Sequence, residues 1–327
     1  MPNRIWPGLI KTALGLALLA ALLAWGRIDV QALHGLTDAP AVVALCILLT
    51  IATLPIAALR WGVVLRTFGI SIRYGTLFHL VGIGLATNLF VPGTVVGDAA
   101  RGVYAWRAVG SGSARIAASV VLDRLIGLFA LITIALMVAT LNWNQIKHVP
   151  VLAALAVSTF AAFAAFVAAA AAVLLGYGLM TRIERVVARW PRLVDLVRHA
   201  RDLALLIRTS PLPLAAAFGL SVLVHACTLA AVVLIAVTMN IGQLGVADYV
   251  FATPLTLVAN AVPLTPNGIG VGEAAFDQIC RWLESARSGA AYSSIFFAFR
   301  AISALACLPG LVSFVVYRRR GSEERAS

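Results

Sequence analysis

Two short stretches far apart in the chain have nearly the same sequence. Residues 88–102 read NLFVPGTVVGDAARG, and residues 260–277 read NAVPLTPNGIGVGEAAFD. Each begins with asparagine, passes through proline and glycine, and reaches the frame glycine–acid–alanine–alanine, in which the acid is Asp98 or Glu273. Both lie in strongly apolar surroundings, where a carboxylate carries a large desolvation cost. A repeated acid beside a repeated chain break indicates a feature that the fold uses twice.

The chain around these stretches is too apolar for a soluble domain. Hydrophobic residues make up 61% of the 327 residues and charged residues only 12%, against about 25% charged residues in soluble domains. A bilayer core about 30 Å thick needs roughly 20 apolar residues per helix. The sequence therefore predicts an all-α polytopic membrane protein. The predicted full spans are 8–25, 40–59, 116–140, 150–177, 212–238 and 289–316.

The distribution of basic residues orients these spans. With the N-terminus in the cytoplasm, 19 of the 25 lysine and arginine residues fall on the cytoplasmic face and four on the opposite face. This bias is the positive-inside pattern of membrane proteins, and it explains the net charge of +12 without nucleic acid binding. Arg318, Arg319 and Arg320 directly follow the last predicted span. Both termini are therefore predicted to be cytoplasmic.

Two further apolar segments, 75–92 and 248–263, are predicted to enter the membrane and return without crossing it. The charge bias holds only if the residues that flank each segment lie on one side, as Arg73 and Arg101 do for the first. Glycine and proline also interrupt both segments. Broken backbone is tolerated at membrane depth only where protein buries it or a wet cavity borders it. We therefore expect two re-entrant hairpins, one from each face.

The order of these features repeats along the chain at an offset that rises slowly from 172 to 176 residues. The corresponding pairs are Asn88 and Asn260, Asp98 and Glu273, and Arg124 and Arg300. Each predicted half contains three spans and one hairpin. Because three is an odd number of crossings, the second half is inverted, as in transporters that bind their substrate near the membrane midplane.

These features divide the chain into predicted units. Residues 1–140 form a first membrane repeat, and residues 141–316 form a second. The second repeat also contains a basic amphipathic segment, 178–210, which is expected to lie on the cytoplasmic leaflet. Residues 317–327 are expected to form a cytoplasmic tail.

Asp98 and Glu273 are the leading candidates for contacts with a substrate. Each follows glycine and precedes a helix-forming run, so N-capping of that helix is the alternative interpretation. Capping does not exclude a substrate role, because the start of a half-helix can bind an anion through backbone N–H groups while the acid meets a cation or a proton. Arg101 follows Asp98 by three residues and can neutralise it on the same helix face.

Three more charged residues are predicted to lie within the membrane. Asp123 and Arg124 fall inside the span 116–140, where charge is rare and usually faces a bundle interior or a water-filled pathway. A structural ion pair with a partner helix is the alternative for these two. Arg300 is the one charged residue from 289 to 317. It is predicted to pair with Glu273 or with the phosphate of a substrate, since a guanidinium suits either.

Amides and chain breaks complete the predicted substrate-binding and translocation site. Asn88 and Asn260 are expected to cap the broken segments, with contact to a lipid headgroup as the alternative. The predicted structural breaks at the site are Pro92, Gly97, Pro266, Gly270 and Gly272. Arg60 and Trp61 are interpreted instead as anchors at the membrane interface.

Motifs of known catalytic or nucleotide-binding sites are missing from the sequence. The chain has no G-x-x-x-x-G-K-[ST] phosphate loop, no H-E-x-x-H metal motif and no nucleophile elbow, which excludes those routes to ATP hydrolysis, metalloprotease chemistry and ester hydrolysis. We therefore predict no catalytic residue, no metal site and no cofactor, and we do not expect the chain to be an enzyme.

Three motifs in this order resemble a known family. They are P-x4-G-D-A-A-R at 92–101, SVVLDRLIGL at 119–128 and PLTPNGIGVGEAAF at 263–276. Together they are similar to the flippase-like transmembrane domain of lysylphosphatidylglycerol synthetases, over roughly residues 10–316. The resemblance implies a multi-pass protein of the bacterial inner membrane that moves a lipid between leaflets. The motif residues that it carries over are Asp98, Arg101, Asp123, Arg124, Gly270 and Glu273.

The chain also departs from that family. It has Val96 and Gly97 where the family often has two glycines before the first acid, and only residues 318–327 follow the last predicted span. The soluble aminoacyl-transferring domain is thus expected to be missing. Synthase activity is not expected, and lysylphosphatidylglycerol becomes a doubtful substrate.

The sequence leads to one main functional hypothesis and two alternatives. The main hypothesis is a lipid flippase or scramblase whose partner is a membrane lipid, either an anionic phospholipid or a polyprenyl-phosphate-linked lipid. One alternative is an intramembrane transferase acting on such a lipid, with Asp98 or Asp123 as base. The other is an accessory membrane subunit that works with a separate synthase, glycosyltransferase or export complex. Assembly with further copies of the chain is left open.

Overall fold

The computed structural model of the chain describes residues 6–29, 31–90, 96–175, 208–261, 268–284 and 289–307, together with 189–190, 201, 205–206 and 265. Regular secondary structure in these ranges is helical throughout. The predicted basic segment 178–210 lies largely outside the described residues, and Pro92, Pro266 and the tail 317–327 lie wholly outside them.

The described helices range from single short turns to helices of 29 residues. Their bounds are α1 (Trp6–Ala24), η2 (Gln31–Leu33), α2 (His34–Thr37), α3 (Pro40–Thr67), α4 (Tyr74–Phe90), α5 (Val96–Val109), α6 (Ser113–Leu141), α7 (Trp143–Ile146), α8 (Pro150–Leu175), α11 (Pro211–Met239), α12 (Val246–Asn260), α13 (Val271–Leu283) and α14 (Ser293–Ala306).

Four of these helices are long and apolar enough to cross a membrane, namely α3, α6, α8 over Pro150–Ala172, and α11. Two shorter apolar helices, Ala13–Ala24 and Ser293–Leu305, lie within α1 and α14. Together they confirm the predicted class, an all-helical polytopic membrane protein. The number of six spans and the two re-entrant segments stay predictions.

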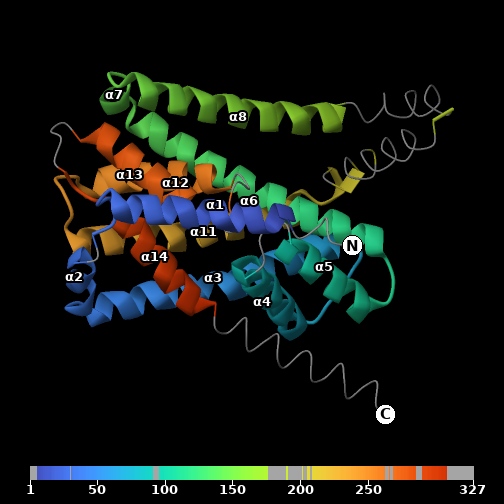
Figure 1. Ribbon diagram of the computed structural model, residues 1–327. Helices are drawn as coiled ribbons and strands as arrows, with labels where there is room; N and C mark the ends of the chain where they lie inside the picture. The colour runs from blue at the N-terminus through green and yellow to red at the C-terminus, as the bar shows by residue number, and fades with distance from the viewer. Residues whose placement is uncertain are drawn as a thin grey trace, which may run out of the picture.

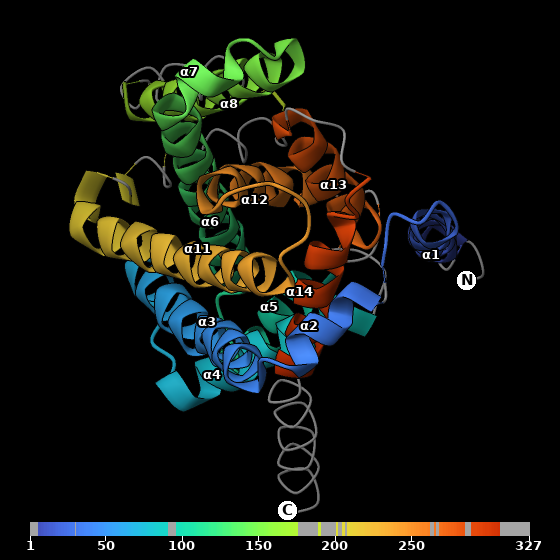
Figure 2. The same cartoon turned by 90° about the vertical axis from the view of Figure 1, so that its left-hand side faces the viewer.

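Helices α3 and α11 lie side by side (Figure 2), form the most extensive contact among the described helices and run in antiparallel directions. Near the start of α3, the Cys46 thiol donates to the Ala231 carbonyl oxygen at 3.6 Å, and further along α3 the Arg60 guanidinium donates to Ser221 at 3.1 Å. Residue numbers thus rise along α3 while they fall along α11. Helix α6 packs against both of them and also against α12.

Two helical hairpins lie toward opposite ends of the α3–α11 pair. Helix α4 packs on α5, and α12 packs on α13. Figure 1 shows the α4–α5 pair toward the end of the bundle where the N-terminus lies, and the α12–α13 pair toward the other end, near α2 and α7. The predicted segments 75–92 and 248–263 correspond to α4 and α12, each of which is the first helix of such a pair.

Small and aromatic residues fill the contacts between helices. Lipid tails are as apolar as leucine side chains, so packing rather than the hydrophobic effect favours association within the bilayer, and small residues permit close approach. Ala135, Ala231 and Ala236 are almost fully buried between helices. In the α12–α14 region, Phe276 stacks near Tyr249 with ring centroids 6.4 Å apart. Small residues thus fill contacts between the long helices, and aromatic rings fill the contact between α12 and α13.

Candidate functional site

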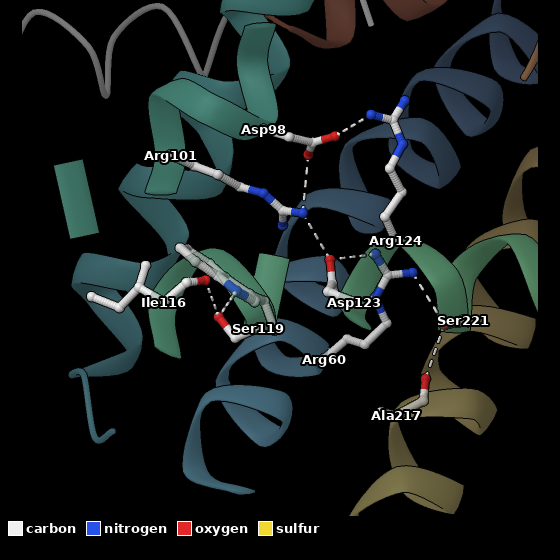
Figure 3. A network of polar contacts seen from close by, with 10 residues as sticks. Arg60, Asp98, Arg101, Ile116, Ser119, Asp123, Arg124, Ala217 and Ser221 are labelled. Atoms are coloured by element: carbon white, nitrogen blue, oxygen red, sulfur yellow. Dashed lines mark hydrogen bonds and ion pairs between the residues drawn. The ribbon is translucent and has the colours of Figure 1, made fainter. Parts of the chain in front are cut away.

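Five charged residues from three helices meet near the α4–α5 hairpin and form what we call the first polar cluster. Its members are Arg60 of α3, Asp98 and Arg101 of α5, and Asp123 and Arg124 of α6. Figure 3 shows them as one connected network. The chain thus brings together all four charged residues that the sequence predicted for its first half, and it adds Arg60.

Asp123 is the fully buried centre of this cluster. Its carboxylate accepts two hydrogen bonds from Arg60, at 2.8 and 3.1 Å, and one from Arg101 at 3.0 Å. Its side chain is 0% exposed. An ionised carboxylate at this depth needs such charge-assisted partners to offset its lost hydration. The pairing with a partner helix that was the alternative for Asp123 is therefore present.

The interpretation of Arg60 and Trp61 as interface anchors is wrong. The Arg60 side chain is only 13% exposed and is directed at Asp123, and Trp61 is fully buried. Helix α3 continues to Thr67, so Arg60 lies within the helix rather than at its end. The positive charge of Arg60 suggested the end of a membrane span, but the Asp123 carboxylate neutralises that charge inside the bundle.

Asp98 connects the buried part of the cluster to its accessible edge. Its carboxylate pairs with Arg101 at 3.0 Å and with Arg124 at 2.7 Å. The Arg124 side chain is 43% exposed, against 7% for that of Arg101. Three guanidinium groups face two carboxylates, so the first polar cluster carries one excess positive charge. Its most accessible member is Arg124.

Aromatic and polar neighbours hold Arg101 in position. Its guanidinium carbon lies 4.8 Å from the centroid of the Trp61 ring, a cation–π distance. The indole N–H of Trp61 in turn donates to the Ser119 hydroxyl at 3.3 Å. Among the described residues, no acceptor reaches the buried Nε of Arg101. The cluster thus retains one buried donor that its own side chains leave unsatisfied.

The second polar cluster, built on Glu273 and Arg300, joins α13 to α14. Arg300 Nε lies 2.5 Å from one Glu273 carboxylate oxygen, and its NH2 group lies 3.3 Å from the other. The Glu273 side chain is 0% exposed. This is the pair that the sequence predicted. Asp98–Arg124 and Glu273–Arg300 thus each join the start of the second helix of a hairpin to the helix that follows it.

Glu273 also caps its own helix, as the alternative interpretation proposed. Its carboxylate accepts a hydrogen bond from the backbone N–H of Gly270 at 2.9 Å, immediately before α13. Arg300 donates in addition to the carbonyl oxygen of Gly268 at 3.0 Å. The turn, the helix start and the ion pair are thus one unit, and a change in any of them disturbs the others.

Each hairpin places its asparagine against the glycine before its acid. Asn88 Oδ1 accepts a hydrogen bond from the Gly97 N–H at 2.9 Å. A Cβ atom added to Gly97 would lie 2.6 Å from Asn88 Oδ1, and one added to Gly272 would lie 3.0 Å from Asn260 Oδ1. Both positions favour glycine, because a Cβ at Gly97 would also overlap the Gly84 carbonyl oxygen and a Cβ at Gly272 would lie 2.5 Å from the Phe296 ring. The expected capping role of Asn88 is thus seen directly.

A cavity of about 210 Å³ lies beside the second polar cluster. It is bordered by α3, α4, α11, α12 and α14. Its polar lining residues are Thr50, Thr53, Thr228, Asn260, Arg300 and Ser303. Thr50, Thr53 and Thr228 lie in the middle portions of α3 and α11, which places the cavity far from the ends of these two helices. The sequence missed these hydroxyl residues, because threonine in an apolar run gives no signal beyond that of a small helix residue.

Comparison with known proteins identifies the family. A family model described as the lysylphosphatidylglycerol synthase TM region matches residues 12–310. The chain belongs to this family. No curated protein and no solved structure matches it. The match confirms the lysylphosphatidylglycerol synthase transmembrane family that the ordered motifs predicted, and it fits a lipid-related, multi-pass membrane protein.

Proposed function

We propose that this member of the lysylphosphatidylglycerol synthase transmembrane family moves a phospholipid or a lipid-linked phosphate between the two leaflets of the bacterial inner membrane. The observation that carries the proposal is the pair of matched ion pairs, Asp98–Arg124 and Glu273–Arg300, each at the start of a half-helix. The two pairs belong to hairpins at opposite ends of the bundle. They are suited to receive a headgroup from either side.

The packing of the helices supports an inverted repeat of six spans and two re-entrant hairpins. The contact of α3 with α4 corresponds to that of α11 with α12, and the contact of α5 with α6 corresponds to that of α13 with α14. The antiparallel contact of α3 with α11 brings the two proposed halves together. Transporters built from such repeats bind their substrate between the halves.

The first polar cluster has the chemistry of a phosphate site. It carries one excess positive charge, and Arg124 is exposed enough to form a two-pronged contact with a phosphate. Helix α5 begins at Val96, two residues before Asp98, so its positive dipole end adds to the same field. A phosphate that displaced Asp98 from Arg124 would exchange one anion for another at little electrostatic cost.

Such a polar route answers the physical difficulty of moving a headgroup through hydrocarbon. A charged group in the centre of a bilayer without partners costs several kcal/mol or more. Side chains that replace water along the way reduce this barrier while the acyl tails stay in the lipid. The described polar groups between the two hairpins include the first cluster, the second cluster and the hydroxyl-lined cavity.

The proposal is tested by reconstitution of the full chain into liposomes that contain fluorescent anionic phospholipids. Wild type is expected to equilibrate the lipids between leaflets, and the double variant Asp98→Asn, Glu273→Gln is expected to lose at least ten-fold in rate, because each removed carboxylate unbalances an arginine. Accessibility of the label to dithionite measures the rate.

The matched control is Asp277→Asn. Asp277 is also a buried acid, paired with Arg281 at 2.7 Å, but it lies outside both polar clusters. This variant should transport at close to the wild-type rate. If wild type moves lipid no faster than the double variant, while both insert in a single orientation and remain folded, the protein is not a lipid transporter.

A further inference from the structure

The cavity beside the second polar cluster has an unusual balance of hydrogen-bonding groups. Four hydroxyls line it, and each donates its hydrogen to a carbonyl oxygen of its own helix. Thr50 donates to Cys46 at 2.7 Å, Thr53 to Thr50 at 2.6 Å, Thr228 to Val224 at 3.1 Å and Ser303 to Phe299 at 2.8 Å. With their hydrogens committed, these hydroxyl oxygens face the cavity as acceptors.

Asn260 also lines the cavity and carries a further acceptor. Its Oδ1 atom is buried against Gly268 and Gly272, and no donor among the described residues reaches it. A buried acceptor without a partner is costly, and native structures rarely retain one without a reason. The cavity volume of about 210 Å³ greatly exceeds the roughly 15 Å³ that one water needs. A ligand with several donor groups would fill this space and donate hydrogen bonds to the four hydroxyl oxygens.

Charge narrows the class of ligand further. None of the described residues that line the cavity is a carboxylate, and Glu273 is fully buried behind its pair with Arg300. The guanidinium of Arg300 is the charged group at the wall. Because Glu273 already pairs with Arg300, an ammonium group in the cavity would find no carboxylate among the described lining residues to compensate its charge. Hydroxyl groups of a sugar or a polyol, in contrast, donate hydrogen bonds without carrying charge.

We propose that this cavity binds a hydroxyl-rich, uncharged part of a lipid headgroup, a polyol or a sugar, and discriminates against aminoacylated headgroups. The inference rests on the proposed lipid transport for the origin of the ligand, whereas the balance of acceptors stands by itself. The hydroxyl-rich group occupies the space between Thr50 and Thr53 on α3 and Asn260 on α12. The phosphate of the same lipid stays outside the acceptor-lined part.

Binding is measured by native mass spectrometry of the full chain in detergent, with lipids that share dioleoyl chains. Phosphatidylglycerol and phosphatidylmethanol carry the same charge, but only the first has a glycerol headgroup with two free hydroxyls. The first is expected to bind roughly ten-fold more tightly, the effect of one or two hydrogen bonds in a dry site. Glucosyl diacylglycerol should bind in the same way, and lysylphosphatidylglycerol more weakly than phosphatidylglycerol.

The variant that isolates the cavity is Thr50→Val, Thr53→Val, which replaces each hydroxyl by a methyl group of similar size. It should abolish the preference for phosphatidylglycerol over phosphatidylmethanol, and Ser303→Ala should reduce it. Thr133→Val is the matched control, because Thr133 makes the same bond to its own helix, at 2.7 Å to Phe129, and does not line the cavity. Thermal unfolding of each variant verifies its fold.

The outcomes separate this inference from the transport proposal. A preference for hydroxyls that survives in the threonine double variant, or equal binding of lysylphosphatidylglycerol, overturns the inference and leaves transport untouched. Lipids that bind with the expected preference but do not cross the bilayer overturn transport alone. Excess glucose that displaces phosphatidylglycerol would show that the acceptors take a free sugar as well, and failure of glucose to compete would show that the lipid is the ligand.

Discussion

At the scale of single residues, burial decides which charges serve stability and which serve exchange with a ligand. Asp123 is 0% exposed and held by two arginines. Asp98 is 19% exposed, and one of its two arginine partners is the accessible Arg124. Removing one member of a buried ion pair leaves an uncompensated charge, but a partly solvated partner can turn to water. The two aspartates of one cluster should therefore respond differently to the same substitution.

We expect Asp123→Asn to destabilise the protein by about 3 kcal/mol or more, because Arg60 would lose its carboxylate partner and Arg101 one of its two. Asp98→Asn should cost much less stability and should mainly slow lipid transport. Unfolding of the purified variants in detergent, followed by loss of helical circular dichroism, compares the two. Equal losses of stability would show that Asp98 is as structural as Asp123.

The sequence predicted the charged residues of the two polar clusters better than it predicted which of them would pair. A buried charge needs a partner, so the Glu273–Arg300 pair follows from two isolated charges in apolar segments. The role of Arg60 does not follow, because an arginine near the end of an apolar run has the same pattern whether it faces headgroups or an aspartate on another helix. Only the contact with Asp123 distinguishes the two, and that contact spans 63 residues of sequence.

At the scale of helices, the predicted boundaries were most accurate where the polarity of the sequence changes sharply. The predicted span 212–238 matches α11 (Pro211–Met239), which begins with proline and ends before the left-handed Asn240. The span 40–59 is too short, since α3 runs to Thr67. The threonines of the central cavity gave no comparable signal, because helical periodicity is identical for a hydroxyl that lines a cavity and one that faces lipid.

The α4–α5 hairpin supplies a prediction at this scale. A methyl group on Gly97 would overlap the carbonyl oxygen of Gly84 and the side chain of Asn88, and the carbonyl cannot move without α4. Gly97→Ala should therefore separate the two helices and cost about 2 kcal/mol or more. Gly102→Ala is the control, since its Cβ would lie 3.6 Å from Val120, an ordinary contact.

Thermal unfolding of the two alanine variants in the same detergent measures the difference. The Gly102 variant should be as stable as wild type or slightly more stable, because alanine favours a helix over glycine. If the Gly97 variant is equally stable and equally active, the close approach of α4 to α5 is not needed for the fold.

At the scale of the whole molecule, the proposed arrangement predicts which loops share a side of the membrane. Ser71 precedes α4 and Ser111 follows α5, so a re-entrant hairpin keeps both on one face. Single cysteines at these positions, in a chain that lacks Cys46, Cys227, Cys280 and Cys307, should react only with a reagent supplied from the cytoplasm.

A cysteine at Asn144, in the exposed helix α7, supplies the opposite control and should react only from outside. Labelling of Ser71→Cys and Ser111→Cys from different sides would mean that the α4–α5 segment crosses the bilayer. The inverted repeat, and with it the matched placement of the two ion pairs, would then be wrong.

Arg60 has a mechanical consequence for any motion between the halves. One guanidinium bonds to Asp123 on α6 and to Ser221 on α11, and its NH1 atom would lie 3.2 Å from a Cβ on Gly127. It thereby connects helices of both proposed halves at a single point near one end of the α3–α11 contact. If one half rocks against the other, this contact acts as the pivot, so the largest displacements are expected at the far end of the α3–α11 contact, where α11 ends at Met239 and α12 begins at Val246.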